Sequence, residues 1–355
     1  MSKENCEKKN ITIKDVANEA GVAVSTASMA FNNKPSISPK TREVVLKAAE
    51  DLGYHPTAAA QALVDGQSNN IGLLVPTRLE NVFFSTGFFN KLISGMNRAA
   101  KQTGNLLSLQ IVDSQKEIPG LIIKAKRAKN LSGSIITHPK VVMPYLDTLK
   151  KYDYPVVFLG NSLRDFPFVD NDNRAVAKLA TNHLIDHGHR RIVFLGGPDN
   201  LTASRTRMGG YKSALSEYGI RVDPELIWEA EHSEQHAYNT VLENAPGTDF
   251  SAICISVEVQ MGGVQRALRV LGLEIPDDVA LITIGDSHLA EYMEPHMTAV
   301  DLHTEELGYW ATKNLNQLIH GEGVPRKKII GADLITRTSC GCNQQGGDFR
   351  EREIH

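Results

Sequence analysis

The chain has 355 residues, of which 41% are hydrophobic and 22% charged, and its formal net charge is −3. At about 100–200 residues per domain, this length predicts two or three domains. No apolar run approaches the ~20 residues that cross a bilayer, and the polar start lacks the apolar segment of a secretory signal. The composition therefore argues against a membrane protein, and we expect a cytoplasmic one.

Charge gives no sign of a nucleic-acid partner. Residues 1–66 carry eight Lys or Arg and eight Asp or Glu side chains, so the segment is neutral. A cluster of positive charge is the usual electrostatic footprint of a DNA-binding domain. Charge alone therefore does not indicate a DNA-binding domain, and only the residue pattern can.

Residues 12–20 are predicted to form a short helix. Thr12 is a plausible N-cap, and Asp15 three positions later nearly completes a capping box. Gly21 ends the helix, because glycine takes the left-handed conformation at low cost. The apolar residues recur at helical spacing: Ile13, Val16, Ala17 and Ala20.

A second helix is expected to begin with Ser25 as its N-cap and to run to about Asn32. Ala27 and Ala30 would face inward toward Ala17, because two helices that cross closely need small residues. Helix, glycine turn and helix together form the helix-turn-helix unit, whose second helix enters the major groove. The residues expected to face the groove are Val24, Ser25, Ser28 and Met29.

A third helix is predicted after Ser38, which is its cap, with Pro39 at the first helical position. It runs from Thr41 to Leu52 and stops at Gly53. A three-helix bundle used only for packing remains an alternative reading. The predicted buried face comprises Val44, Val45, Ala48, Ala49 and Leu52.

The N-terminal pattern resembles the lactose/galactose repressor (LacI-type) family of bacterial transcriptional regulators. The matching segments are Thr12 to Ser28, Asn32, Ser38 to Arg42, and Leu52 to Pro56. The resemblance implies a hinge helix over the following residues that orders on the operator and inserts Leu63 into the minor groove. An ordinary apolar linker residue is the alternative for Leu63. The DNA-binding residues expected on this basis are Thr12, Val24, Ser25, Thr26, Ser28, Met29, Asn32, Ser36, Ala60 and Leu63.

One position departs from the family. Relatives usually carry an arginine directly after Ser28, where this chain has Met29. Arginine reads guanine through two hydrogen bonds, whereas methionine offers only apolar contact, for instance to a thymine methyl group. We therefore expect an operator half-site that differs from the common one.

From Ile71 onward, short apolar runs alternate with amphipathic helical stretches, which is typical of parallel sheets covered on both faces. A polar break over 160–172 favours two halves over one large sheet. The predicted strands are 71–76, 106–112, 133–137, 155–159, 191–195, 251–255 and 279–284. The predicted helices are 88–103, 140–151, 173–187, 205–218 and 259–271.

The core also resembles the family, in the segments 154–159, 179–197, 207–215 and 267–279. The resemblance implies an α/β core like the periplasmic binding proteins, made of two Rossmann-type lobes, behind the all-α three-helix helix-turn-helix head. The chain would cross between lobes near 161, 299 and 327. A ligand would lie in the cleft at the carboxyl ends of the strands.

Arg207 matches the family's ligand-anchoring arginine, and a guanidinium suits hydroxyls or a carboxylate. Sugar-binding relatives usually show Asn-Asp and Asp-Asp after two of the strands, where this chain has Val257-Glu258 and Gly285-Asp286. An ordinary monosaccharide is therefore not expected, and an anion would suit Arg207. A purely structural interlobe cation is the alternative for Arg207. The candidate ligand-binding residues are Asn161, Arg207, His232, Glu258 and Asp286.

The remaining motifs indicate neither a metal site nor a catalytic site. Cys340 and Cys342 could give two metal ligands, but we find no Cys/His pair at a zinc-site spacing, so reduced thiols and no metal are expected. His187 and His189 are expected to cap the end of a helix, and Asp172 to cap the start of one. Gly-x-Ser-x-Gly does not occur, so we expect neither an enzyme nor a cofactor.

The predicted organisation is a disordered extension (1–10), a DNA-binding domain (11–56), a hinge helix and linker (57–68), an effector-binding and dimerisation core (69–342) and a flexible tail (343–355). The N-lobe would comprise about 71–161 and 299–326, and the C-lobe about 162–298 and 327–342. A homodimer is expected to bind palindromic operator DNA and to respond to a small-molecule effector, or to a protein co-regulator. The tail has no heptads, so no coiled-coil tetramer is expected. The competing hypothesis is a cytoplasmic solute- or partner-binding protein with a DNA-inactive head.

Overall fold

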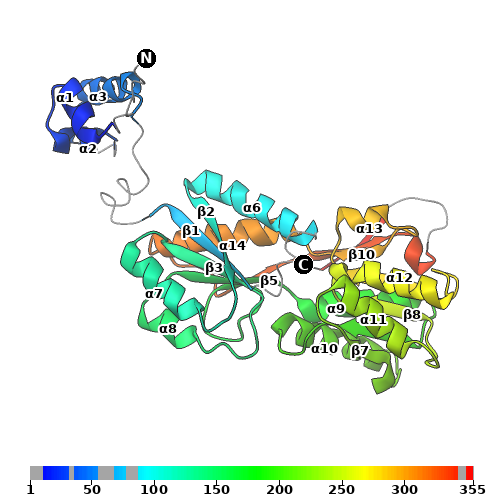
Figure 1. The fold of residues 1–355 in the computed structure, drawn as a ribbon. Helices are drawn as coiled ribbons and strands as arrows, with labels where there is room; N and C mark the ends of the chain where they lie inside the picture. The colour runs from blue at the N-terminus through cyan, green and yellow to red at the C-terminus, as the bar shows by residue number, and fades with distance from the viewer. Residues whose placement is uncertain (1–10, 32–35, 55–67, 77–86, 343–348, 355) are drawn as a thin grey trace, which may run out of the picture. The chain divides into compact units, whose positions relative to one another are not determined.

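The computed structural model describes residues 11–31, 36–54, 68–76 and 87–342, together with the backbone of 349–354. The chain divides into two compact units, Met1–Asn69 with Arg127–Leu131, and Asn70–Lys126 with Ser132–His355. The first unit contains three described helices and the second contains both sheets (Figure 1). The expected extension, hinge helix and linker, as well as Asn32, Ala60 and Leu63, lie outside the described residues, except for the end of the linker from Ser68.

The helices of the first unit are α1 (Ile13–Glu19), α2 (Val24–Phe31) and α3 (Pro39–Asp51). At the start of α1, the Asp15 carboxylate accepts hydrogen bonds from the Thr12 N–H (2.8 Å) and hydroxyl (2.7 Å). After α1, Gly21 has φ +64°, and the Val22 N–H donates to the Ala17 carbonyl at 2.9 Å. This hydrogen bond gives the Ala17 carbonyl a partner at the end of α1. The helix therefore ends at the glycine, as the sequence predicted.

Two details of the head differ from the sequence-based expectations. Ser25 is not the cap of α2, because the Ala27 N–H already bonds the Ala23 carbonyl and the helix begins at Val24. Val44 is 46% exposed, because the buried stripe of α3 is centred on Val45 and Val44 lies at its edge. The cap at Ser38 is confirmed, since its hydroxyl accepts the Thr41 N–H at 3.1 Å.

Small residues let the three helices pack closely. Ala17, Ala27 and Ala30 are at most 2% exposed, which confirms the predicted crossing of α1 and α2. Tyr54 closes the cluster with its ring centroid 5.7 Å from that of Phe31. One face of α2 therefore packs against α1 and α3, and the opposite face points away from the three-helix bundle.

The N-lobe is a six-stranded parallel sheet in the order β11-β5-β4-β3-β1-β2. Helices α6 (Gly87–Thr103) and α14 (Thr304–Ile319) pack together on one face, and α7 (Ile118–Ala128) and α8 (Leu146–Lys151) lie on the other (Figure 1). The strands are β1 (Asn70–Pro76), β2 (Leu106–Val112), β3 (Gly133–Thr137), β4 (Val156–Leu159), β5 (Phe168–Asn171) and β11 (Lys327–Ile330).

The C-lobe sheet runs in the order β13-β12-β10-β9-β8-β6-β7, and only the pairings of β12 with β10 and β13 are antiparallel. The helices of this lobe are α9 (Asn173–Asp186), α10 (Thr202–Glu217), α11 (Glu234–Asn244), α12 (Met261–Leu271) and α13 (His288–Tyr292). The strands are β6 (Ile192–Gly196), β7 (Ile227–Glu229), β8 (Ala252–Ile255), β9 (Ala280–Ile284), β10 (Thr298–Asp301), β12 (Ala332–Thr336) and β13 (Phe349–Ile354).

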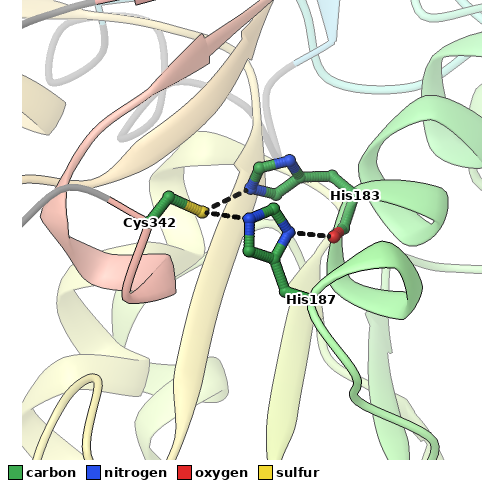
Figure 2. A group of neighbouring side chains, drawn as sticks. All are labelled: His183, His187 and Cys342. Atoms are coloured by element: carbon green, nitrogen blue, oxygen red, sulfur yellow. Dashed lines mark hydrogen bonds between the residues drawn. The ribbon is translucent and has the colours of Figure 1, made fainter.

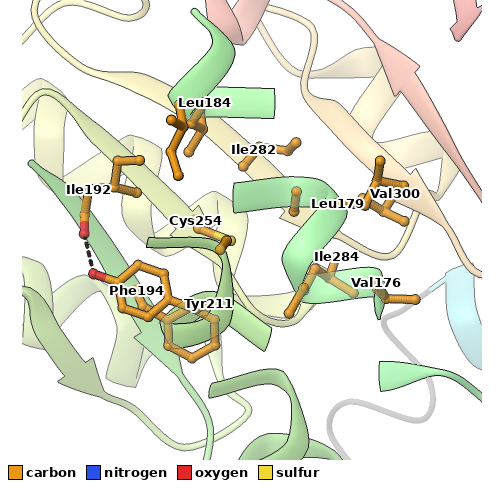
Figure 3. Close-up of a cluster of buried hydrophobic side chains, with 14 of the residues drawn as sticks. Val176, Leu179, Leu184, Ile192, Phe194, Tyr211, Cys254, Ile282, Ile284 and Val300 are labelled. Atoms are coloured by element: carbon orange, nitrogen blue, oxygen red, sulfur yellow. Dashed lines mark hydrogen bonds between the residues drawn. The ribbon is translucent and has the colours of Figure 1, made fainter. Parts of the chain in front are cut away.

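Successive apolar side chains along the strands pack against helices on both faces of the C-lobe sheet. On β6, Ile192 and Phe194 pack against α9 and α10, and Figure 3 shows this cluster. Val193 and Leu195 point to the other face and pack with α11 and α12. Successive strand side chains point to opposite faces, so a strand that is buried on both sides has a continuous apolar sequence.

All seven expected strands are present to within a residue or so, and the break between the halves separates two sheets. The chain crosses between sheets after β5, β10 and β11, somewhat later than the expected crossings near 161, 299 and 327. Within the stretch that we expected to be a polar break, Phe168–Asn171 forms β5, which belongs to the first sheet and pairs with both β4 and β11.

Two other expectations were wrong. The helix expected over 140–151 begins only at Leu146, because Pro144 disfavours helical backbone at the residue before it. The tail was expected to be flexible, yet 349–354 form β13 along β12. β13 pairs with backbone N–H and C=O groups of β12 that would otherwise be unpaired at the edge of the sheet.

Candidate functional sites

The outward face of α2 carries the residues predicted to read DNA. Val24 is 41% exposed, Ser25 is exposed, and Thr26, Ser28 and Met29 are half-buried. The buried residues of the same helix are Ala27 and Ala30. The helix therefore presents the expected side chains on the side opposite its packing face.

Two further predicted DNA-contacting residues lie at the ends of the neighbouring segments. Thr12 is exposed at the start of α1, where the first turn begins. Ser36 is exposed, and its hydroxyl donates to the Met29 sulfur at 3.8 Å. Met29 therefore has a polar neighbour that holds its thioether at the edge of the outward face.

Two adjoining cavities lie in the second unit, between elements of the two lobes. The larger has a volume of about 1070 Å³ and the smaller about 110 Å³. His138, His232 and Glu258 line both, and they follow β3, β7 and β8. The strand order reverses beside β1 and β3 in one sheet and beside β6 and β8 in the other, which is where such folds bind ligands.

Arg207 lines the smaller cavity and is held by two hydrogen bonds. Its Nε donates to Asn173 Oδ1 at 2.7 Å, and its Nη1 donates to the Ser256 carbonyl at 2.5 Å. The Asn173 amide in turn donates to Asp170 Oδ1 at 2.9 Å. Burial raises the pKa of Asp170 to about 6, against the opposing effect of its hydrogen bonds and of Arg207.

Three polar atoms at the cavities have no hydrogen-bond partner among the described residues. They are His138 Nδ1, His232 Nε2 and Glu258 Oε2. Burial lowers the pKa of His138 to about 4 and that of His232 to about 3, and it raises the pKa of Glu258. Buried polar atoms without a partner cost free energy, so a bound ligand that supplies partners would be stabilised here.

Hydrogen bonds join the lobes at the edges of the cavities. The Phe88 N–H on α6 donates to Glu258 Oε1 at 3.0 Å, and the Thr202 N–H and hydroxyl each donate to the Pro139 carbonyl at 3.2 Å. Each of these bonds would break if the lobes separated. The cavities are thus bounded by contacts that hinge motion would make or break.

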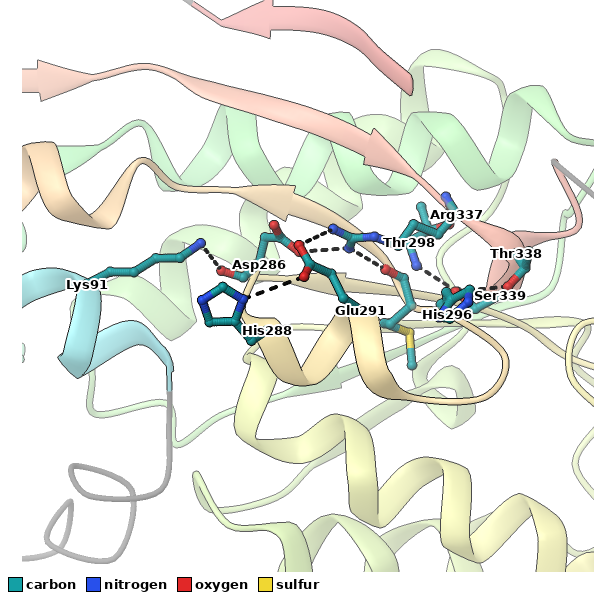
Figure 4. Close-up of polar contacts among 10 residues, drawn as sticks. Lys91, Asp286, His288, Glu291, His296, Thr298, Arg337, Thr338 and Ser339 are labelled. Atoms are coloured by element: carbon teal, nitrogen blue, oxygen red, sulfur yellow. Dashed lines mark hydrogen bonds and ion pairs between the residues drawn. The ribbon is translucent and has the colours of Figure 1, made fainter. Parts of the chain in front are cut away.

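Asp286 and Asn161 do not line either cavity. The Asp286 carboxylate pairs with Arg337 at 2.7 Å, and its carbonyl accepts from Lys91 Nζ at 2.9 Å (Figure 4). Asn161 uses its amide oxygen to accept the Leu163 N–H at 2.9 Å. The structure therefore brings together Arg207, His232 and Glu258, but not these two.

Sequence reasoning missed His138, Asp170 and Asn173 as residues of the cleft. His138 directly follows β3, and the other two lie at the end of β5 and the start of α9. Polar residues at strand ends were the available signal. The strand β5 went unpredicted, so Asp170 was treated as part of a polar interruption, whereas Asp172 does cap α9 as expected.

Within the described residues, no helix is both long and apolar enough to cross a membrane.

Two protein families match the chain. "Bacterial regulatory proteins, lacI family" matches residues 12–57, and "Periplasmic binding protein-like domain" matches 181–340. HTH-type transcriptional regulator MalR of Streptococcus pneumoniae is 30% identical, over 92% of this chain and 97% of that protein. HTH-type transcriptional regulator CelR of Thermobifida fusca is 29% identical, over 92% and 98%.

Solved structures are similar along nearly the whole chain. A CelR–cellobiose complex has a TM-score of 0.71 at 28% identity, covering 93% of this chain and 99% of that chain. A lac repressor dimer bound to operator and the anti-inducer ONPF has a TM-score of 0.82 at 23% identity, covering 94% and 99%. The second likeness bears on the fold alone.

Proposed function

This chain belongs to the lacI family of bacterial regulatory proteins, and from that premise we propose that it is a repressor that binds a palindromic operator as a homodimer. It is a DNA-binding transcriptional regulator with a helix-turn-helix head and a periplasmic-binding-protein-like core. The proposal extends this to repression, to two half-sites, and to control by a ligand between the lobes.

One observation supports DNA reading by the head more than any other. The packing face of α2 is closed by Ala27 and Ala30, while Val24 and Ser25 stay exposed on the opposite side. An α-helix with one free face of short side chains fits the major groove of B-DNA. Two such heads in a dimer would read two half-sites of a palindrome.

The residues that line the cavities favour a neutral, hydroxylated ligand over an anion. Arg207 already bonds Asn173 and Ser256, and the carboxyls of Asp170 and Glu258 line the same cavity. The Asp170 carboxylate would repel an anion, whereas hydroxyl groups can donate to either carboxyl group and accept from Arg207.

The size of the cavities favours a ligand larger than a monosaccharide. The larger cavity, of about 1070 Å³, is at the upper end of the range for small-molecule sites. A similar regulator, CelR, has been solved as a complex with the disaccharide cellobiose. We therefore infer an oligosaccharide-like effector for this chain.

The DNA-binding part of the proposal is tested by salt-titrated binding to a palindrome from upstream of the chain's own gene. Specific binding should exceed binding to a scrambled duplex by about 10³ or more, and log affinity should fall steeply with log salt. Ser25→Glu, which puts a negative charge on the outward face, should abolish the preference. Leu46→Glu is the matched control on α3, at a site that is 46% exposed.

A flat salt dependence and equal binding to both duplexes would contradict the proposal. That result would favour the competing hypothesis of a solute- or partner-binding protein with an inactive head. Loss of binding in both glutamate variants would instead show that a negative charge anywhere on the head weakens binding. The outward face of α2 would then have no special role.

The effector is tested by a thermal-shift panel of monosaccharides, oligosaccharides, sugar acids, sugar phosphates and nucleosides. Ligand that binds the native state raises the apparent melting temperature by mass action. An oligosaccharide should give the largest shift and should change operator affinity. Arg207→Met should lose both responses while it retains operator binding; a shift confined to sugar acids or phosphates would overturn the neutral-ligand assignment.

A further inference from the structure

A cluster of sulfur and nitrogen donors lies in the C-lobe, apart from the residues that line the cavities. His183 lies in the last turn of α9 and His187 is the C-cap of that helix, while Cys342 follows the short 3-10 helix Thr338–Cys340. Figure 2 shows both imidazoles pointing at the Cys342 sulfur, which lies 3.2 Å from His183 Nε2 and 3.0 Å from His187 Nε2. The three donor atoms lie within 4.8 Å of one another.

Cys340 places a second sulfur beside that of Cys342. Its Sγ is 2.6 Å from that of Cys342, and the thiol is 4% exposed. The Thr298 hydroxyl donates to Cys340 Sγ at 3.1 Å. A hydrogen bond of this kind stabilises a thiolate, which is the form of cysteine that binds metals.

The surroundings also orient one of the imidazoles. His187 Nδ1 lies 2.7 Å from the His183 carbonyl oxygen, which can only accept, so Nδ1 carries the proton of the neutral ring. The lone pair of His187 is then on Nε2, the atom that faces Cys342. Histidines that bind metals are usually held by such a hydrogen bond from the other ring nitrogen to a carbonyl or carboxylate.

We propose that His183, His187, Cys340 and Cys342 form a structural binding site for Zn²⁺. Two thiolates and two imidazoles are a ligand set that zinc takes in closed tetrahedral sites. Sulfur and nitrogen donors also disfavour the hard cations Mg²⁺ and Ca²⁺, which take oxygen ligands.

The distances from the Cys342 sulfur to the two imidazole nitrogens are close to those that a tetrahedral ion imposes. With Zn–S of about 2.3 Å and Zn–N of about 2.0 Å, a sulfur and a nitrogen ligand lie about 3.5 Å apart. The two separations from Cys342 need to grow by only a few tenths of an ångström. The two sulfurs would separate to about 3.8 Å, which requires a shift of Cys340 by about 1 Å.

The sequence concealed this site because its two halves are far apart along the chain. The helical pair is His-x-x-x-His, a spacing that places both rings on one face, and the other pair is Cys-x-Cys. We expected His187 to close α9, and it does so through Nδ1, which leaves Nε2 for the metal.

A metal here would fasten the segment after β12 to the end of α9. The neighbouring Ser339 accepts the Thr298 N–H at 2.8 Å and donates to the Leu281 carbonyl at 2.8 Å, so the segment is already anchored on the sheet. Zinc would add a link from this anchored segment to the helix. Binding to the native state alone would raise the melting temperature of the C-lobe.

The experiment measures the metal content of the untagged full chain, purified without chelators, by mass spectrometry of the elements. The expected result is one zinc per chain. After removal of the zinc, added Co²⁺ should give the absorption bands of a tetrahedral ion with thiolate ligands, and should raise the melting temperature.

His187→Gln and Cys342→Ser should each reduce bound metal to background and remove the cobalt spectrum. His189→Gln is the matched control, because His189 Nδ1 lies 2.9 Å from Ser251 Oγ and the residue is not one of the clustered donors. Circular dichroism of each variant shows whether it remains folded. If a variant unfolds, the cobalt spectrum of the unaltered chain still shows whether a tetrahedral site with thiolate ligands exists.

Two results would overturn the proposal. One is the absence of zinc from the purified chain together with the absence of a cobalt spectrum after thiol reduction. The other is equal metal content in the His187→Gln, Cys342→Ser and His189→Gln variants, which would place the metal elsewhere.

Discussion

We propose that Met29 sets the operator preference. It is half-buried at the edge of the outward face of α2, with the Ser36 hydroxyl 3.8 Å from its sulfur. A thioether makes apolar contacts and cannot form the paired hydrogen bonds by which arginine reads guanine. The residue is therefore expected to select against guanine at one position of the half-site.

Met29→Arg should move that preference toward guanine, with a discrimination of about 1–3 kcal/mol. The measurement is competitive binding of the full chain to operator duplexes that differ at single positions. The unaltered chain is the reference, and Leu46→Arg adds the same charge on α3 as a control. An identical ranking of duplexes for the unaltered and Met29→Arg chains would contradict this role.

His138, a half-buried histidine of the cleft with a buried Nδ1, should make stability depend on pH. The pKa of His138 is about 4 in the folded chain, below the ordinary value of 6.5. The unfolded chain therefore binds more protons between these values, so this contribution is complete above pH 6.5 and is lost as pH falls toward 4. At 1.36 kcal/mol per pKa unit, the shift corresponds to about 3 kcal/mol at full effect.

His138→Asn should flatten the fall in unfolding free energy between pH 6.5 and pH 4, as measured by urea titration. Asparagine suits the site because His138 has φ +52°, a left-handed conformation that asparagine tolerates. His288→Asn is the control, at a side chain that is 79% exposed. Parallel pH profiles for the unaltered chain and His138→Asn would refute this contribution.

At the scale of single residues, caps and small crossing residues were predictable because their chemistry is local. Gly21, Ser38 and Asp172 each act within one turn of a helix, and each was predicted correctly. The environment of Asp286 was not predictable. Its partners Arg337 and Lys91 come from distant segments, and only the folded chain brings them together.

Among the elements, the crossing of α6 and α14 depends on glycine. A Cβ at Gly308 would lie 2.1 Å from the Leu92 carbonyl oxygen, and one at Gly95 would lie 1.8 Å from the Glu305 carbonyl oxygen. The backbone of each helix therefore fills the space that a Cβ at the glycine of the other helix would need. A substitution at either position must push the helices apart.

Gly308→Ala should lower the free energy of unfolding by about 1–3 kcal/mol through overpacking. Gly120→Ala, within α7, should instead raise it by about 0.5–1 kcal/mol, because no atom lies within 4 Å of the added Cβ and alanine is the better helix former. Urea unfolding of the full chain measures both. Equal effects of the two substitutions would contradict the close crossing.

Strands with a continuous apolar sequence were predictable, whereas strands that mix apolar with polar or charged residues were not. The second group includes β10 and β12, which are buried inner strands of the C-lobe sheet. Strands such as β3 and β9 are buried on both faces and have continuous apolar sequences. β11 has the sequence Lys-Lys-Ile-Ile and is only partly buried, so its pattern does not mark a strand. Its place beside β5 is set by pairing, which local sequence does not reveal.

At the scale of the molecule, two lobes were predictable from the alternation of strands and helices, but their composition was not. Each sheet contains strands from separate parts of the chain, and β5 and β11 pair in the first sheet although a whole lobe lies between them in sequence. The zinc site proposed in the C-lobe has the same origin, since α9 and the segment after β12 meet only in the fold.

The most direct test of the central claim is selection of duplexes from a random DNA library by the full chain, followed by sequencing. A homodimeric operator-binding repressor should enrich an inverted repeat whose half-sites are spaced to match two heads, with a position that disfavours guanine opposite Met29. Failure to enrich any sequence over the starting library, at low salt and with the ligand-free chain, would contradict the claim.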